Sequence, residues 1–262
     1  MRVFLPHAQV SAEETRSRLI RLLKLMEERF SDMYLIVALA NLYGDVDFRI
    51  PGDKQDNGGG FYTHRPIGDN KDLLSVDWFR QGFKVNYLPF VRTIVQDEFI
   101  RNSPRIMAYN IGNELKAESR GEAFNIGHPD LLVDFMHTMA RQLHQLDGDR
   151  HLITTGMIST RHAHGRQHRP AAAAVRHPRL DFITNHSYHG DDRPETNLEQ
   201  ENEAPSPEDD SDLVGPLGKP LLIEEAGFKP TENRQNRSAW VAREPGCCSS
   251  RNRPAAICPG VS

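Results

Sequence analysis

Two glutamates follow largely apolar runs of the kind that form buried strands. Glu114 follows residues 106–112, and Glu225 ends the run that begins at residue 220. Carboxylates carried by different parallel strands can face one another across the mouth of a barrel. One can protonate a departing oxygen while the other attacks carbon, which is what cleavage of a glycosidic bond requires. The pair therefore predicts glycoside hydrolysis.

The segments that would position these glutamates alternate between β-branched runs and helical patterns. Ser11 with Glu14 forms a capping-box signature that begins one helix, residues 87–95 indicate a second that ends near Asn102, and Pro129 opens a third. Strands are predicted at residues 2–5, 34–40, 105–112, 151–155, 180–186 and 220–225. This alternation is typical of an α/β fold with a parallel sheet.

The polar residues favour a barrel over an open doubly wound sheet. Asn113, Glu114, His186 and Glu225 all lie at the C-terminal ends of apolar strands, which form the catalytic face of a (β/α)8 TIM barrel. A dinucleotide-binding sheet would carry a glycine fingerprint after its first strand, and the sequence has none there. We therefore expect a barrel.

Composition narrows the classes of partner. The chain has 262 residues, 38% of them hydrophobic, which suits one soluble domain with a full core. The net charge of −4, without a basic stripe, argues against nucleic acid. The longest apolar run, residues 34–40, is far shorter than the roughly 20 residues that cross a bilayer, so no membrane partner is expected.

The two ends of the sequence bear on export and redox chemistry. No signal-peptide pattern follows Met1, so the sequence as it stands predicts a cytoplasmic protein, or a secreted or periplasmic one if a leader was lost. All the cysteines, Cys247, Cys248 and Cys258, lie near the C-terminal end. The domain body is therefore not expected to depend on disulfides or a thiolate metal site.

From Arg2 to about Trp240 the sequence resembles glycoside hydrolase family 5, the clan A family of cellulases and β-mannanases. Residues 112–115, Gly-Asn-Glu-Leu, are similar to the Asn-Glu-Pro motif of strand 4, with Leu115 replacing the common proline. Residues 181–188 are similar to the strand 6 motif, whose His and Tyr line the site. Residues 219–227 are similar to the strand 7 motif, whose nucleophilic glutamate precedes one residue and then glycine, which selects Glu225 over Glu224.

The resemblance implies a retaining mechanism acting on β-1,4-linked oligo- or polysaccharide, either glucan or mannan. Glu225 would be the nucleophile and Glu114 the acid and base, with their carboxyl groups roughly 5–5.5 Å apart. No metal or organic cofactor is implied. The substrate-binding residues implied are Arg2, Asn41, Asn113, His186 and Tyr188.

By the same resemblance the first predicted strand corresponds to strand 2 and the last to strand 7. We therefore expect a TIM barrel incomplete at both ends, with about six parallel strands in residues 1–240. Residues 241–262 have no regular period and are interpreted as an irregular tail, which a frameshift would explain. Open barrel edges expose unpaired backbone groups, which predicts a homo-oligomer.

Two other hypotheses remain open from the sequence. One is a catalytically inactive carbohydrate-binding or structural remnant of such a barrel. The other is a metal protein that uses His162, His164, His168 and His177. Their spacing fits no structural metal motif, so a solvated loop is the preferred interpretation of that segment.

Overall fold

The computed structural model describes residues 1–5, 10–40, 79, 82–85, 87–113, 129–157, 175–188 and 217–227. The strands are β1 (Arg2–Phe4), β2 (Leu35–Ala38), β3 (Ile106–Asn110), β4 (Leu152–Thr154), β5 (Ile183–Tyr188) and β6 (Leu221–Gly227). The helices are α1 (Ala12–Arg29), α3 (Phe83–Val85), α4 (Tyr87–Val95), α5 (Glu98–Arg101) and α6 (Pro129–Asp147). The proposed tail, residues 241–262, lies outside the described residues.

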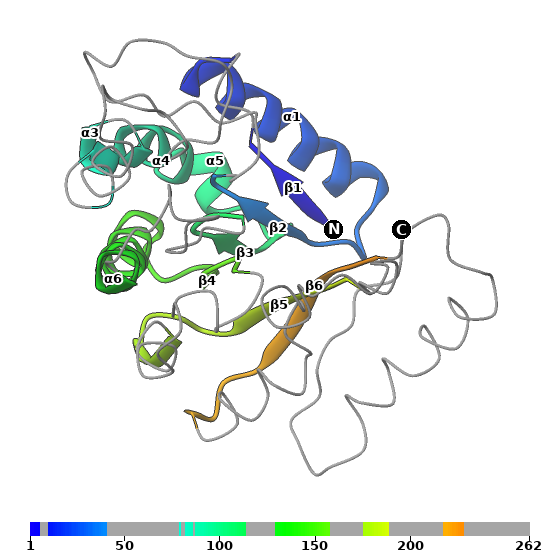
Figure 1. The fold of residues 1–262 in the computed structure, drawn as a ribbon. Coiled ribbons are helices and arrows are strands. Elements are labelled where there is room, and N and C mark those ends of the chain that lie inside the picture. The colour runs from blue at the N-terminus through cyan, green and yellow to red at the C-terminus, as the bar shows by residue number, and fades with distance from the viewer. Residues whose placement is uncertain are drawn as a thin grey trace, which may run out of the picture.

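The described strands run parallel and follow one another in chain order (Figure 1). β1 to β4 form one hydrogen-bonded sheet and β5 pairs with β6. The segment before β5 joins the two groups, because the Asp181 backbone N–H donates to the Ile153 carbonyl at 2.9 Å. The Thr154 hydroxyl also donates to the Phe182 carbonyl at 2.9 Å. The prediction of parallel strands alternating with helices is thereby confirmed.

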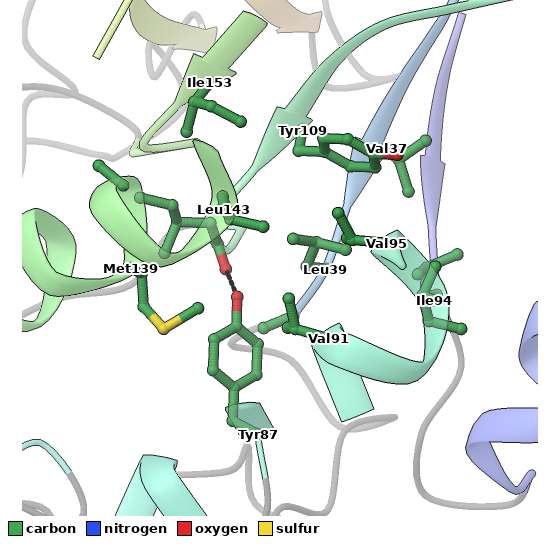
Figure 2. Packing of buried hydrophobic residues seen from close by; sticks show 14 of the residues in the cluster. Val37, Leu39, Tyr87, Val91, Ile94, Val95, Tyr109, Met139, Leu143 and Ile153 are labelled. Atoms are coloured by element: carbon green, nitrogen blue, oxygen red, sulfur yellow. Dashed lines mark hydrogen bonds between the residues drawn. The ribbon is translucent and has the colours of Figure 1, made fainter. Parts of the chain in front are cut away.

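The sheet has an apolar layer on each face. On the outer face, Val37, Tyr109 and Ile153 pack against helices α4 and α6, in the cluster shown in Figure 2. On the other face a smaller cluster joins side chains of β2, β3 and β6 with Phe182, which precedes β5; its members are Ile36, Ala108, Phe182 and Leu222. Arg2 of β1 also contacts Glu224 and Glu225 of β6, and this contact between the first and last described strands shows that the strands curve around a common interior.

Helix α1 begins where the sequence predicts. The Ser11 side chain accepts a hydrogen bond from the Glu14 backbone N–H at 3.1 Å, which satisfies one of the free donors of the first turn. Leu19, Leu23 and Met26 are buried on the face turned to the sheet. The N-cap and the apolar periodicity together explain why this segment is helical.

The single helix predicted from residue 87 to about residue 102 is wrong in one respect, because the segment divides into α4 and α5. Asp97 lies between them in an extended conformation, and its carboxylate accepts hydrogen bonds from the backbone N–H groups of Phe99 and Ile100. A side chain that caps a new helix competes with continuation of the preceding one. The apolar period alone does not show this competition.

In the part of the chain that the structure describes, no helix is long and apolar enough to cross a membrane.

Candidate active site

Side chains from strands β1, β3, β5 and β6 meet in one polar cluster. Arg2 comes from β1, Asn110 from the last position of β3, His186 from β5, and Glu224 and Glu225 from β6. Val3, Tyr109 and Ile183 of the same strands belong to the outer apolar cluster or pack against it, so the alternation of side chains along a strand turns Arg2, Asn110 and His186 to the opposite face.

Arg2 contacts both glutamates. Its Nη1 donates a short hydrogen bond to Oε1 of Glu225, and its Nη2 lies 3.4 Å from Oε2 of Glu224. The Arg2 side chain is 8% exposed, that of Glu225 is 20% exposed and that of Glu224 is fully buried. Of the two carboxylates, only Glu225 is therefore open to a ligand from solvent.

His186 lies between the same two carboxylates and is fully buried. Its Nε2 is 3.4 Å from Oε2 of Glu224, and its Nδ1 is 3.7 Å from Oε2 of Glu225. An imidazolium donates from both ring nitrogens, so a protonated His186 would be matched to both partners. Among the described residues, the site thus brings two carboxylates together with one guanidinium and one imidazole.

Asn110 fixes the inner carboxylate. Its side-chain Nδ2 donates to both oxygens of Glu224, at 3.0 Å and 2.8 Å. Such an arrangement restrains both the position and the rotation of the carboxylate plane. The structure therefore anchors Glu224 from β3 as well as from β1 and β5.

A register shift in the pairing of β5 and β6 explains why consecutive glutamates share one face. Asn185 pairs with Ile223 and His186 with Glu225, which leaves Glu224 as an extra residue on β6. Successive side chains of a regular strand point to opposite faces, whereas a bulge redirects one of them. Sequence reasoning chose between Glu224 and Glu225, but the structure brings both to the cluster.

The predicted site residues are only partly placed. Arg2, His186 and Glu225 are brought together as described above. Asn113 lies just beyond β3 and is buried, and its backbone N–H donates to the Ala40 carbonyl at 2.7 Å.

The remaining predicted residues cannot be positioned. Glu114 and Asn41 lie outside the described residues, as does the side chain of Tyr188, whose backbone ends β5. The separation of the Glu114 and Glu225 carboxyl groups therefore stays a prediction.

Two residues of the cluster were missed, namely Asn110 and Glu224. Asn110 is a polar residue inside an otherwise apolar strand, and this was the available sequence signal. Glu224 carried no comparable signal, because alternation predicts that one of two consecutive side chains faces away from the barrel interior.

Among the described residues, no group of three or more His, Cys, Asp or Glu side chains is arranged to hold a metal ion. Of the histidines named for the metal hypothesis, His177 is described and stacks on His137 of α6, with ring centroids 4.6 Å apart. His162, His164 and His168 lie outside the described residues.

Solved structures with similar folds are glycoside hydrolases. An endo-1,4-β-D-mannanase from Thermotoga petrophila RKU-1 superposes with a TM-score of 0.57 at 20% identity, covering 89% of this chain and 66% of that one. An endo-β-1,4-mannanase structure from Thermotoga petrophila gives 0.60 at 18% identity, covering 99% and 58%. The family 26 endo-β-1,4-mannanase from Bacillus sp. JAMB-750 gives 0.50 at 12% identity, covering 95% and 62%.

The chain thus spans less than two thirds of the length of these three structures. No protein-family model and no curated protein matches the sequence. The structural likeness shows a TIM-barrel fold and confirms the predicted fold class. It does not single out family 5, because a family 26 enzyme is among the similar structures.

Proposed function

We propose that the protein is a retaining glycoside hydrolase that cleaves β-1,4-linked polysaccharide, with mannan as the first candidate and glucan as the second. The observation that carries the proposal is the contact of Arg2 and His186 with Glu225, in which His186 and Glu225 lie in the C-terminal halves of β5 and β6. The active sites of TIM barrels are built toward the C-terminal ends of their strands. Mannan is placed first because the similar structures named above are mannanases.

Glu225 is the proposed nucleophile. Its carboxylate attacks the anomeric carbon while Glu114 donates a proton to the departing glycosidic oxygen, which leaves a glycosyl ester on Glu225. Glu114, now ionised, then takes a proton from water as that water attacks the same carbon and releases Glu225. Two inversions give net retention at the anomeric centre.

The surroundings of Glu225 support this role. A nucleophile must be reachable and held in a fixed orientation, because misplacement of the reacting atoms is costly to the rate. Glu225 is the more exposed of the two glutamates, and Arg2 of β1 and His186 of β5 each contact one of its two oxygens. Glu224, fully buried, does not meet the first requirement.

The decisive experiment measures reducing ends released from β-1,4-mannan, glucomannan and a soluble β-1,4-glucan. We expect release from at least one of them, and a loss of at least about a thousandfold in E225Q and in E114Q, which lack an essential carboxylate. E14Q, in an exposed carboxylate of α1, is the matched control and should retain full activity. Release that survives in E225Q would contradict the assignment.

Trapping the intermediate tests the mechanism itself. A 2-deoxy-2-fluoro glycoside with a good leaving group should add one glycosyl mass to the protein, and peptide mapping should locate it on Glu225. Proton NMR of the first product should show retained anomeric configuration. The competing hypothesis, carbohydrate binding without cleavage, predicts saturable binding of the polysaccharide with neither product nor label.

A further inference from the structure

We propose that Glu224 is a positioning residue, which holds Arg2 and His186 in place against Glu225. Its assignment to a reaction rests on the proposed function above, whereas the arrangement of charges can be tested without any turnover. Glu224 is fully buried in the site and therefore acts through its neighbours, not through contact with a substrate.

The first step of the argument is that the Glu224 carboxylate is itself fixed. Asn110 donates from one nitrogen to both of its oxygens, at 3.0 Å and 2.8 Å. Asn110 is fully buried and cannot move aside into solvent. The carboxylate of Glu224, on β6, is thus held in a fixed position by Asn110 of β3.

The second step is that Arg2 and His186, which contact Glu225, also contact Glu224. Arg2 uses Nη1 for Glu225 and Nη2 for Glu224, and His186 uses Nδ1 for Glu225 and Nε2 for Glu224. A side chain held at two points has little freedom to rotate, so loss of Glu224 would release both groups from one of their two anchors. Residues that hold the neighbours of a reacting group keep that group within narrow geometric limits.

The third step concerns why a carboxylate occupies this position at all. Burial of an ionised carboxylate is costly, and apolar residues of similar volume often replace buried ion pairs without loss of stability. The bulge that turns Glu224 inward also interrupts the β5–β6 ladder. Glu224 therefore costs stability in two ways, through its buried charge and through the interrupted ladder. Its presence is better explained by its effect on Arg2 and His186 than by a contribution to stability.

The first test follows the His186 imidazole by 15N NMR as pH is varied, in the wild type and in E224Q. The charged groups that contact His186 include Glu224 and Glu225, Arg2 contacts both of these carboxylates, and Asn110 donates to Glu224 as a neutral group. Glutamine keeps the shape but removes a negative charge 3.4 Å from Nε2. We expect the titration midpoint of His186 to fall by roughly one pH unit in E224Q.

The matched control is D147N. Asp147 also has a fully buried carboxylate in contact with a histidine, but it lies at the end of α6 and its partner is His151. D147N should lower the free energy of unfolding, as other substitutions of buried residues do, but it should leave the titration midpoint of His186 unchanged. An identical His186 midpoint in E224Q and the wild type would overturn the proposal.

The second test is kinetic and includes N110A, which keeps the Glu224 charge but removes its anchor. In both E224Q and N110A we expect kcat on the best polysaccharide to fall at least about tenfold with little change in KM, because positioning of Glu225 is lost and the sugar contacts remain. D147N, measured below its melting temperature, should retain kcat. A wild-type kcat in folded E224Q would also overturn the proposal.

The two tests separate the two proposals. A shifted His186 midpoint together with no hydrolysis by the wild type would support the arrangement of charges and contradict the proposed function. Hydrolysis that is lost in E225Q but unchanged in E224Q would support the proposed function and contradict the positioning role of Glu224.

Discussion

The side-chain amide of Asn110 occupies space that a side chain at position 156 would need. A Cβ placed on Gly156 would lie 2.6 Å from Nδ2 of Asn110 and 2.6 Å from the carbonyl oxygen of Gly112. Gly156 also has a φ of +73°, in the region that other residues rarely adopt. The glycine that follows β4 therefore sets how closely β3 can approach, and with it the group that anchors Glu224.

We predict that Gly156→Ala destabilises the protein and disturbs the site. The left-handed backbone conformation alone costs a non-glycine residue about 1–2 kcal/mol, and the contacts with Asn110 and Gly112 add to that cost. Urea denaturation should show a loss of more than about 2 kcal/mol in the free energy of unfolding.

Gly218 provides the matched control for this substitution. It has a similar φ of +66°, but a Cβ there would meet no atom of the described residues within 4 Å. Gly218→Ala should therefore show only the backbone cost. Equal losses in the two variants would mean that the approach to Asn110 is not the reason for the glycine.

Two buried tyrosines differ in the partners of their hydroxyl groups. The Tyr87 hydroxyl donates a short hydrogen bond to the carbonyl of Ile111, just past β3, and Figure 2 draws the buried Tyr87 beside α6. The Tyr109 hydroxyl, equally buried, has no hydrogen-bond partner among the described residues. Burial raises the pKa of both phenols well above the ordinary value. Both hydroxyls therefore stay protonated at neutral pH.

We predict opposite outcomes for the two Tyr→Phe variants. Tyr87→Phe leaves the Ile111 carbonyl without this donor and should cost about 1–2 kcal/mol of unfolding free energy. Tyr109→Phe removes a hydroxyl that gains nothing from burial, so its stability should match or exceed that of the wild type. Thermal melts of both variants at neutral pH check this, and a larger loss in Tyr109→Phe would contradict it.

The fold could be predicted because its signals are local and repeat along the chain. The apolar run at residues 34–40 predicts a strand covered on both faces, and β2 (Leu35–Ala38) is buried throughout. The capping pattern at Ser11 likewise predicts the start of α1. Both depend only on neighbouring residues, so no knowledge of distant parts of the chain is needed.

The site was less predictable because it depends on pairing between distant segments. Arg2 and Glu225 are 223 positions apart, and their contact follows only from the resemblance and the curvature of the barrel. The bulge opposite His186 is a property of the β5–β6 register, which no local pattern encodes. Glu224 was therefore passed over, although it stands next to the chosen residue.

His177 lies outside the proposed site, in a group of basic side chains. Its ring stacks on His137, its Nε2 lies 3.4 Å from Nη1 of Arg141, and Nδ1 accepts a hydrogen bond from the Arg179 backbone N–H. Its backbone carbonyl accepts a hydrogen bond from Nζ of Lys219 at 2.6 Å. Burial and then the nearby positive charges, His137 first among them, lower the pKa of His177 from 6.5 to about 4.

This lowered pKa predicts a loss of stability in mild acid. Between pH 6.5 and about 4 the unfolded chain binds a proton at His177 more readily than the folded chain does, so the free energy of unfolding should fall as pH decreases through that window. Above pH 6.5 the imidazole is neutral in both states and contributes no slope. His177→Gln should therefore flatten the pH dependence of urea midpoints between pH 7 and pH 4.5, and His137→Gln, which removes one of the facing groups, should flatten it in part. A steeper dependence in His177→Gln would contradict the sign, because it would mean that the folded state favours the imidazolium.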